Sequence, residues 1–483
     1  MCNSRVAPYG NDEGNHLMAI DPDSPVRLSG RQRLTLVVLL GAGFMLSVDF
    51  SILNVALPQM GEGVGLDIGD LPWIASAYAL PAAGFTLLFG RVADLYGRRR
   101  LFLIAMVLLI VASLLGGFAT GPATLLTARV LQGFANAIAI PAAMALLITA
   151  VADDRARARV LGLNGALLSG GFTVGALVGG SLVSALDWRW AFWINVPVAV
   201  AIVALTPFVV RESARPTGVR LDVPGAVSVT TGLLALVYGV SLRDWRAFAA
   251  GVVLLGVFWV VETRAKAPLV SLRLLNRPTV KWGNFGGVVA FVMSTGLNFV
   301  LTVYLQDVLG LAPFTTGLVF GLPGLAAVFA GILAGRLIGR YGYRPILAAG
   351  LLVQGLMAAP MLLVDDSTTS LYVIVPSLFL LYFGHVTAIV AYTVTATSGL
   401  AESQAGLATG LTSLAQQIAV TIGIPIFGAV AASQADLIAG VHLTMRVQVI
   451  AIVLAVAVIW FGLRSPSTVD AAPASDAVEA PSR

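Results

Sequence analysis

The sequence predicts an all-α integral membrane protein with two six-helix halves and two extra helices between them. The first observation is composition: 58% of the 483 residues are hydrophobic and 11% are charged, with a mean hydropathy of +0.91, whereas about a quarter of the residues in soluble domains are charged. The second is a series of apolar runs long enough to cross a bilayer. The third is a charged motif that occurs twice, which indicates an internal duplication.

Fourteen apolar runs have the length of a membrane-spanning helix, about 20 residues. They cover 34–57, 73–93, 101–119, 123–150, 160–183 and 190–210, then 224–242 and 246–263, then 281–306, 314–335, 345–364, 371–398, 404–432 and 441–463. Polar, turn-rich ends favour disorder. The predicted domains are therefore an N-tail at 1–33, a first half at 34–210, a linker at 211–280 that holds the two extra helices, a second half at 281–463 and a C-tail at 464–483.

The duplication is visible in a loop motif. GRVADLYGRR begins at Gly90, and GRLIGRYGYR begins at Gly335, an offset of 245 residues. The first predicted spans of the two sets of six begin at 34 and 281, an offset of 247 residues. Because the two offsets nearly agree, each half is expected to carry the loop at the same place.

Orientation follows from the positive charges. With the N-terminus inside, the inner segments hold 24 of the 29 Lys and Arg residues, and the outer loops hold three. This bias predicts that both termini are cytoplasmic and that the protein lies in the cytoplasmic membrane. The net charge of +5 is thus explained by the positive residues that determine membrane topology, and it does not indicate nucleic-acid binding.

The sequence contains no GxxxxGK[ST] phosphate loop, no HExxH and no cysteine–histidine cluster; it has one cysteine and three histidines. Direct use of ATP, a metal site and an enzymatic activity are therefore not expected. An ion gradient, or the gradient of the solute itself, remains as the energy source. The expected partners are a small-molecule substrate, protons and lipid, with no cofactor, and nothing requires more than a monomer.

Four strings carry a family resemblance. GRVADLYGRRR (90–100) resembles the loop between the second and third spans of the major facilitator superfamily. With VDFSILNVALP (48–58), ARVLQGFANAIAIPAA (128–143), DWRWAFWINVP (187–197) and fourteen spans, the chain is similar to the fourteen-span drug:proton antiporter family over about 34–463. The resemblance implies the major facilitator fold and transport by alternating access.

The resemblance also implies that the 90–100 loop clamps the two halves together in the outward-facing state. Gly90 and Gly97 permit a tight turn, Asp94 can accept hydrogen bonds, and Arg98 faces the anionic membrane surface. Gly339 replaces the aspartate in the second copy, so a clamp there is expected to be weaker or absent. The alternative is that the arginines only determine topology.

Ionisable residues inside the bilayer are functional candidates by default. Asp49 lies about 12 Å from the outer end of its predicted span, and Arg129 lies about 9 Å from the same side, at a rise of about 1.5 Å per residue. We expect Arg129 to pair with an ionised Asp49, and a proton on Asp49 to release the pair. The alternative is a static buried ion pair.

A polar helical stripe contains Arg129 together with Gln132, Gly133 and Asn136. We expect this stripe to face the cavity. Hydrogen bonding to neighbouring helices, without contact to a solute, is an alternative that is nearly as well supported. Asn54 lies about 140° from Asp49 around the helix and ranks lower.

Span five carries GFTVGALVGG, which resembles the antiporter signature except that Ala176 stands where proline is expected. Its small-residue face, Gly171, Gly175 and Gly179 followed by Gly180, favours tight helix packing.

In the second half, His385 lies near the midplane with Tyr392 on the same face, where it could relay protons, contact substrate or remain neutral and bonded. The other candidates for the substrate cavity are Asn298, Tyr304, Gln306, Gln416 and Gln417, with packing roles equally open.

Together these features predict proton-coupled efflux of amphipathic organic compounds such as antibiotics or dyes across the cytoplasmic membrane. An exporter dedicated to one metabolite, amino acid or self-made antibiotic is the alternative. A transport-inactive sensor or assembly partner is a remote one.

Overall fold

The structure is a computed structural model that describes residues 29–67, 70–151, 154–212, 223–241, 244–264, 272–400 and 402–463. Every regular element in these ranges is a helix. Most of the predicted N-tail, the C-tail, the linker segments 213–222 and 265–271 and the side chain of Gln417 lie outside the described residues.

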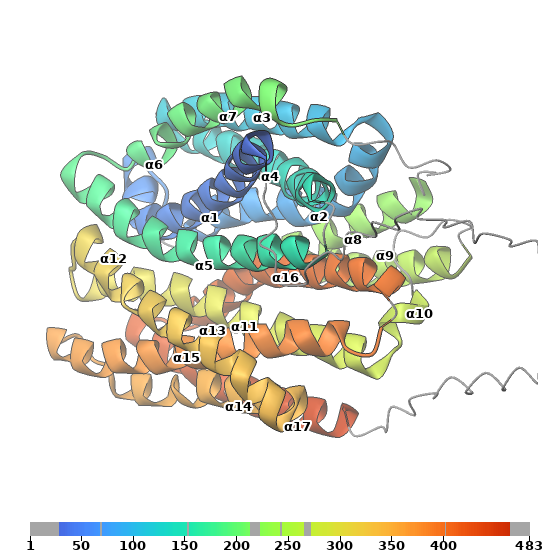
Figure 1. Cartoon of the computed structure of the whole chain (residues 1–483). Helices are drawn as coiled ribbons and strands as arrows, with labels where there is room; N and C mark the ends of the chain where they lie inside the picture. The colour runs from blue at the N-terminus through green and yellow to red at the C-terminus, as the bar shows by residue number, and fades with distance from the viewer. Residues whose placement is uncertain are drawn as a thin grey trace, which may run out of the picture.

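The helices form two halves that lie side by side, with the chain passing from one to the other through a helical hairpin (Figure 1). The first half comprises α1 (Gly30–Val64), α2 (Pro72–Tyr96), α3 (Arg98–Gly117), α4 (Pro122–Ala150), α5 (Asp154–Ala185), α6 (Trp190–Trp193) and α7 (Asn195–Val209). The connecting segment comprises α8 (Val223–Ser241), α9 (Trp245–Arg264) and α10 (Leu272–Leu275). The second half comprises α11 (Pro278–Val303), α12 (Pro313–Gly321), α13 (Pro323–Tyr341), α14 (Tyr343–Leu356), α15 (Leu371–Thr397), α16 (Glu402–Ala431) and α17 (Leu437–Gly462). A π-helical turn, Tyr304–Val308, continues α11, and two 3-10 turns, Ala359–Leu363 and Thr368–Ser370, join α14 to α15.

Helical elements run through each of the predicted ranges, but fewer of them qualify as membrane spans. Nine helices of the described residues are long and apolar enough to cross a membrane, and α2, which bends by 55° within its length, makes a tenth. The chain is thus a multi-pass, all-helical protein.

Several boundaries differ from those predicted, and prolines explain most of them. The predicted span 190–210 breaks at Ile194, the span 314–335 breaks at Leu322, and the span 345–364 leaves the α-helix after Leu356. Each break lies beside or shortly before a proline, which cannot donate to the carbonyl four residues earlier. Other prolines do not end a helix. Pro58 lies inside α1, which continues to Val64 and ends where Gly65 takes a φ of 75°, and further prolines lie inside α2, α4, α7, α15 and α16, at Pro81, Pro141, Pro207, Pro376 and Pro425.

The duplication appears as a repeated backbone turn. Gly97 separates α2 from α3 with a φ of 113°, and Gly342 separates α13 from α14 with a φ of 81°. Positive φ favours glycine because it has no Cβ. Gly97 and Gly342 therefore form the same kind of turn between two helices in the two halves.

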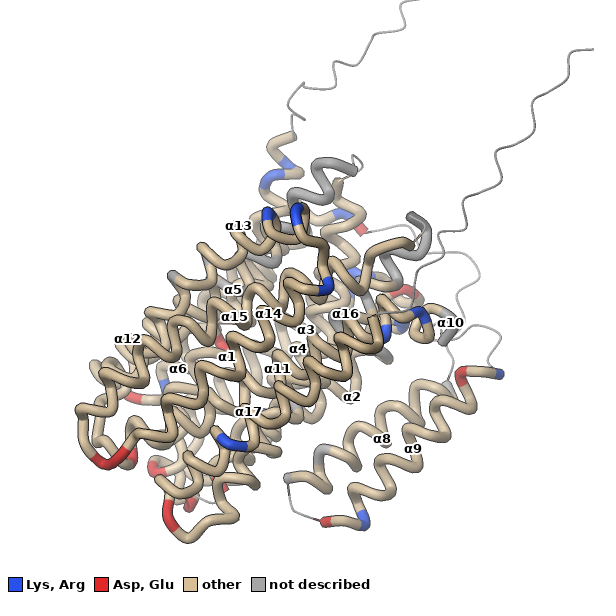
Figure 2. Tube along the Cα trace, turned by 90° about the horizontal axis from the view of Figure 1, so that it is seen from below, with Lys and Arg blue, Asp and Glu red and all other residues tan. Residues whose placement is uncertain are grey.

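The two ends of the bundle differ in charge. Figure 2 shows Lys and Arg gathered at one end and most Asp and Glu at the other. We call the end that carries Gly97 and Gly342 the arginine-rich end, and the opposite end, which carries Gly65, the far end. The described contacts between the halves include a group near the far end, where Gln306 donates to the carbonyl of Val55 at 2.9 Å.

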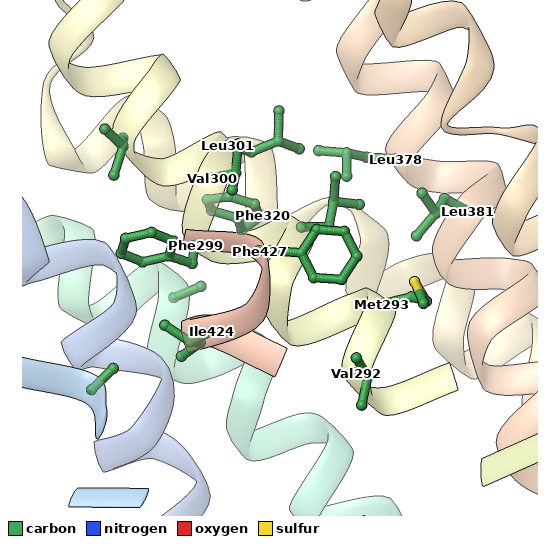
Figure 3. Close-up of a cluster of buried hydrophobic side chains, with 14 of the residues drawn as sticks. Val292, Met293, Phe299, Val300, Leu301, Phe320, Leu378, Leu381, Ile424 and Phe427 are labelled. Carbon is green, nitrogen blue, oxygen red and sulfur yellow. The ribbon is translucent and has the colours of Figure 1, made fainter. Parts of the chain in front are cut away.

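The second half has a continuous apolar core. Phe299, Phe320 and Phe427 come from α11, α12 and α16 and gather with aliphatic side chains of α15 (Figure 3). This core fixes the positions of the polar residues that interrupt it.

The hairpin of α8 and α9 is not wholly peripheral. α9 exposes large apolar side chains such as Trp245, Phe248 and Trp259, as a surface that faces lipid requires. α8, however, contacts α2 of the first half and α16 of the second half, and Thr230 donates a buried hydrogen bond to the carbonyl of Gly84 at 2.6 Å.

Candidate functional site

Asp49 lies near the middle of α1 and is completely buried. Its Oδ1 accepts hydrogen bonds from the side-chain amides of Asn195 and, at 3.5 Å, of Gln132. Its Oδ2 has no hydrogen-bond partner among the described residues. A carboxylate in this position costs several kcal/mol within a bilayer unless it is neutralised or paired, so Asp49 is the chemically exceptional group of the first half.

Arg129 of α4 is 2% exposed and is held by its neighbours. Its Nε donates to the carbonyl of Ile74 at 3.0 Å, its Nη1 donates to Oε1 of Gln132 at 2.6 Å, and its guanidinium lies 4.5 Å from the ring centroid of Tyr78. We expected Arg129 to pair directly with an ionised Asp49. In the described structure no ion pair joins the two residues, because Gln132 lies between them. The amide oxygen of Gln132 accepts a hydrogen bond from Arg129, and its amide nitrogen donates one to Asp49.

The polar stripe of α4 lies inside the first half. Gln132 also contacts Ser113 of α3, at 3.3 Å, and both Gln132 and Asn136 are buried. Gly133 packs against the backbone of α2 at Tyr78. In this structure Gln132 therefore hydrogen-bonds to α1 and α3, and Asn136 is buried beside it; contact of the stripe with a solute stays a prediction.

Two members of this cluster were not singled out from the sequence. Asn195 begins α7, and Ser113 lies on α3. Asn195 falls within the string DWRWAFWINVP and is a polar residue in an apolar run, which is the signal that could have identified it. Its partner could not be found that way, because Asp49 precedes it by 146 residues.

Asp94 lies at the end of α2 and makes an ion pair with Arg98 at 2.8 Å, both side chains being partly exposed. Of the predicted clamp glycines, Gly90 precedes this pair along the chain and Gly97 lies between its two members. Glu212, after α7, accepts from the backbone N–H of Arg99 at 3.0 Å, so the loop is bonded within its own half.

The glycines of α5 lie where other helices come closest. A Cβ on Gly171, Gly175 or Gly179 would meet backbone atoms of α1, and one on Gly180 would lie 2.5 Å from the carbonyl oxygen of Pro313 in α12. The first three glycines thus allow α1 and α5 to pack closely within the first half. Gly180 allows α5 to contact the second half.

Tyr304 and Gln306 are buried in this structure. The hydroxyl of Tyr304 donates to the carbonyl of Asp365 at 2.5 Å. The amide of Gln306 donates to Val55 and accepts from Gln59 at 2.8 Å, across the boundary between the halves. Both side chains therefore hold backbone segments together at the far end.

A second buried polar group surrounds Asn298. Its Oδ1 accepts from the hydroxyl of Tyr382 at 2.6 Å, a residue that the sequence did not single out. Asn298 also lines a void of about 10 Å³ between the halves together with Asn54, Phe172 and Phe320. Such a void is about the size of one water molecule, so the centre of the protein is closed here.

His385 is buried beside this group. Its ring packs edge-on against Phe291 and Tyr382, with centroids 5.4 and 5.7 Å away, and its Nδ1 has no hydrogen-bond partner among the described residues. Tyr392 packs on the other side of Phe291, at 6.2 Å. Gln416 is half-buried in α16.

A larger cavity of about 670 Å³ opens at the arginine-rich end of the first half. It lies between the start of α1 and the ends of α4 and α7, and Arg31, Thr149 and Glu212 contribute to its lining. It does not reach the cluster around Asp49.

Two helical halves joined in series, with a buried carboxylate and arginine in the first, define a multi-pass membrane transport protein. The model of the Major Facilitator Superfamily matches residues 39–424. The chain belongs to this family, whose members are transporters and not enzymes.

Similar proteins include proteins that are named for drug resistance. The chain is 34% identical over 418 residues to the puromycin resistance protein pur8 of Streptomyces alboniger, covering 83% of each chain. It is 32% identical over 416 residues to the multidrug resistance protein Stp of Mycobacterium tuberculosis, covering 83% of this chain and 76% of that one. The crystal structure of the human organic anion transporter MFSD10 is 17% identical and has a TM-score of 0.63, covering 89% of this chain and all of the other, which shows the shared fold.

Proposed function

We propose that the protein exports amphipathic organic compounds, such as antibiotics or dyes, in exchange for protons. In this proposal it lies in the cytoplasmic membrane with fourteen spans and both termini in the cytoplasm. The charge difference between the two ends of the bundle supports that orientation, and the resistance proteins among its relatives support the class of substrate.

The burial of Asp49 is the observation that carries the proposal. A carboxylate enclosed by α1, α3, α4 and α7, with one oxygen lacking a partner in the described structure, costs several kcal/mol unless it is protonated or paired, so it is suited to binding and releasing a proton. Arg129, linked through Gln132, supplies the positive charge that stabilises Asp49 when the proton leaves. Loss and gain of a proton thus change the hydrogen bonds among four helices, which can bias one conformation over another.

Alternating access requires contacts that form in one state and break in the other. Gln59–Gln306 and Gly180–Pro313 are contacts of this kind at the far end. The pair Asp94–Arg98 is bonded within its own loop, as expected for a clamp that engages only in the opposite state. Substrate would bind near the midplane between the halves, where Asn298 and His385 lie.

Growth measurements test the function. A host that lacks its own efflux pumps is grown with and without this gene against unrelated cationic and neutral antibiotics and dyes. We expect resistance to several compounds, lost in Asp49→Asn and retained in Asp366→Asn, the same change at an exposed loop carboxylate. Inverted vesicles then measure uptake driven by a proton gradient, and normal coupling in Asp49→Asn would remove this residue from the mechanism.

A dedicated exporter of one compound is the second candidate, favoured by the relative that is named for resistance to a single antibiotic. Resistance to one compound alone in the same growth panel would support it.

A further inference from the structure

Asn195 is held in one orientation beside Asp49. Its side chain is 1% exposed, and its Nδ2 donates both to Oδ1 of Asp49 and to the carbonyl of Ala191 at 3.4 Å. Both acceptors are oxygens, so the nitrogen of the amide must point toward them and the amide oxygen must point elsewhere. The donor and acceptor sides of this amide are thus determined by its contacts.

Two oxygens of this pair lack partners. Oδ2 of Asp49 and Oδ1 of Asn195 are both buried and have no hydrogen-bond partner among the described residues. Two acceptors cannot bond to each other. They belong, however, to two planar groups that are already joined through their other atoms, and the terminal torsions of Asp and Asn are broad, so the groups can become coplanar and bring the two oxygens together.

The other groups around Asp49 have their own partners. The charged and titratable groups that face it from the packed helices are Arg129 and Tyr78. The guanidinium of Arg129 is bonded to Ile74 and Gln132 and stacked on Tyr78. Gln132 approaches Oδ1 of Asp49, the oxygen that Asn195 also contacts. None of these contacts satisfies Oδ2.

We propose that Asn195 accepts a hydrogen bond from the protonated form of Asp49. With a proton on Oδ2, the acid O–H donates to Oδ1 of Asn195 while Nδ2 of Asn195 continues to donate to Oδ1 of Asp49, which forms a cyclic acid–amide pair with two hydrogen bonds. The proton comes from water and returns to water, and no covalent bond between heavier atoms changes. Asn195 is a positioning residue, and the inference rests on the proposed function in taking Asp49 as the proton carrier.

The pair connects proton binding to helix contact. When Asp49 is protonated, α1 and α7 are joined by two hydrogen bonds through this pair, and both buried oxygens are satisfied. When the proton leaves, one hydrogen bond remains and the amide oxygen of Asn195 again lacks a donor. Protonation therefore strengthens the contact between these two helices, through a side chain that lies at the first residue of α7.

Infrared difference spectra of the full-length protein in lipid bilayers, recorded between acid and alkaline pH, test the pair. We expect a carboxylic-acid C=O band that disappears in Asp49→Asn and moves to higher frequency in Asn195→Leu, because the acid then loses its hydrogen bonds to the amide. The matched control is Asn284→Leu. Asn284 is also buried, also donates to a carbonyl four residues earlier, and also has an amide oxygen without a described partner, but it lies in α11. This control should leave the band in place.

The outcomes separate the two claims. If Asp49→Asn removes the band but Asn195→Leu leaves it unmoved, the acid–amide pair is wrong and the proton on Asp49 stands. If Asp49→Asn removes no band, the proton assignment itself fails. Should Asn195→Leu not insert, asparagine-selective 13C labelling of the unmodified chain replaces it: a pH-dependent shift of the amide C=O band, absent in Asp49→Asn, supports the pair, and a pH-independent amide band overturns it.

Discussion

Arg99 and Arg344 occupy equivalent positions in the two halves and make equivalent hydrogen bonds. Each lies two residues after a glycine with positive φ, Gly97 or Gly342. Nη1 of Arg99 donates to the carbonyl of Val210 at 3.2 Å, and Nη2 of Arg344 donates to the carbonyl of Trp460 at 2.7 Å. Both carbonyls lie at or near the end of the last helix of their own half. The repeated motif therefore anchors the loop between its second and third long helices to the sixth.

Removing these anchors should destabilise each half, and the second half more. Arg344 also stacks on Trp460, its guanidinium 4.2 Å from the ring centroid. We expect Arg99→Ala to lose about 0.5–1.5 kcal/mol for one hydrogen bond and Arg344→Ala to lose a further 0.5–1 kcal/mol, roughly, for the stacking contact. Thermal unfolding in detergent, followed by tryptophan fluorescence, measures both. Arg340→Ala, at an exposed arginine, is the control, and an equal loss there would contradict the specific role of the two anchors.

Asp94→Ala should slow turnover and leave substrate binding intact. The Asp94–Arg98 pair is partly exposed, and pairs of this kind contribute about 0–1 kcal/mol, so the variant should remain folded. Its effect would then fall on the state in which the loop engages the other half. Transport in vesicles and equilibrium binding of the same compound separate the two quantities. Asp187→Ala breaks another exposed ion pair, with Arg189, and should not slow turnover. Unchanged turnover in Asp94→Ala would indicate that the loop determines topology and does not act as a clamp.

Gly180→Ala should open the far end. The added Cβ would lie 2.5 Å from the carbonyl oxygen of Pro313, and overpacking against backbone costs about 1–3 kcal/mol. We expect a population with α5 and α15 farther apart at this end. Spin labels at Leu186→Cys and Tyr372→Cys, both exposed positions, in a Cys2→Ser background measure the distance.

Gly331→Ala provides the comparison for Gly180→Ala, because a Cβ there would meet nothing within 4 Å. A distance distribution in Gly180→Ala that matches the one in Gly331→Ala would show that the contact between α5 and α12 does not hold the far end closed.

Acid should weaken the turn that holds Tyr304. The backbone N–H of Ser367 and then the hydroxyl of Ser370 hold the pKa of Asp365 below its ordinary value of 3.8. A carboxyl whose folded pKa is lowered adds stability that is present above its unfolded pKa and is lost as the pH falls through the folded one. Asp365→Asn should therefore be less stable than the unmodified protein at neutral pH, and the difference should shrink as the pH falls below the ordinary value. Thermal midpoints recorded across this range test it, and a difference that grows on acidification would contradict it.

The helical ranges were predictable because apolar runs of bilayer length have few alternatives. The duplication was predictable as well, since the motif copies place glycine where the backbone needs positive φ. Helix ends were less predictable: Pro58, Pro81 and Pro141 lie within α1, α2 and α4, whereas Pro323 and Pro360 lie at breaks in their predicted spans. Sequence position does not show which neighbours surround a proline.

The candidate site was predictable in its charges and not in its connections. Asp49 and Arg129 stand out because ionisable groups are rare in apolar runs. That Gln132 lies between them depends on how α1 and α4 rotate against each other. Tyr304 and Gln306 were expected near substrate, yet their hydrogen bonds to Asp365 and Val55 are set by the π-helical turn after α11, which has no sequence signature in this chain.

The position of α8 makes the two sides of the protein unequal toward lipid. Where the halves meet, α2 and α16 form one seam and α5 and α12 form the other, and α8 lies against both helices of the first seam. Thr230 of α8 donates a hydrogen bond to α2, so the hairpin is bonded to the first half and packs on the second. Helix α8 therefore covers the seam between α2 and α16. A solute that approaches the centre from the bilayer is confined to the seam between α5 and α12.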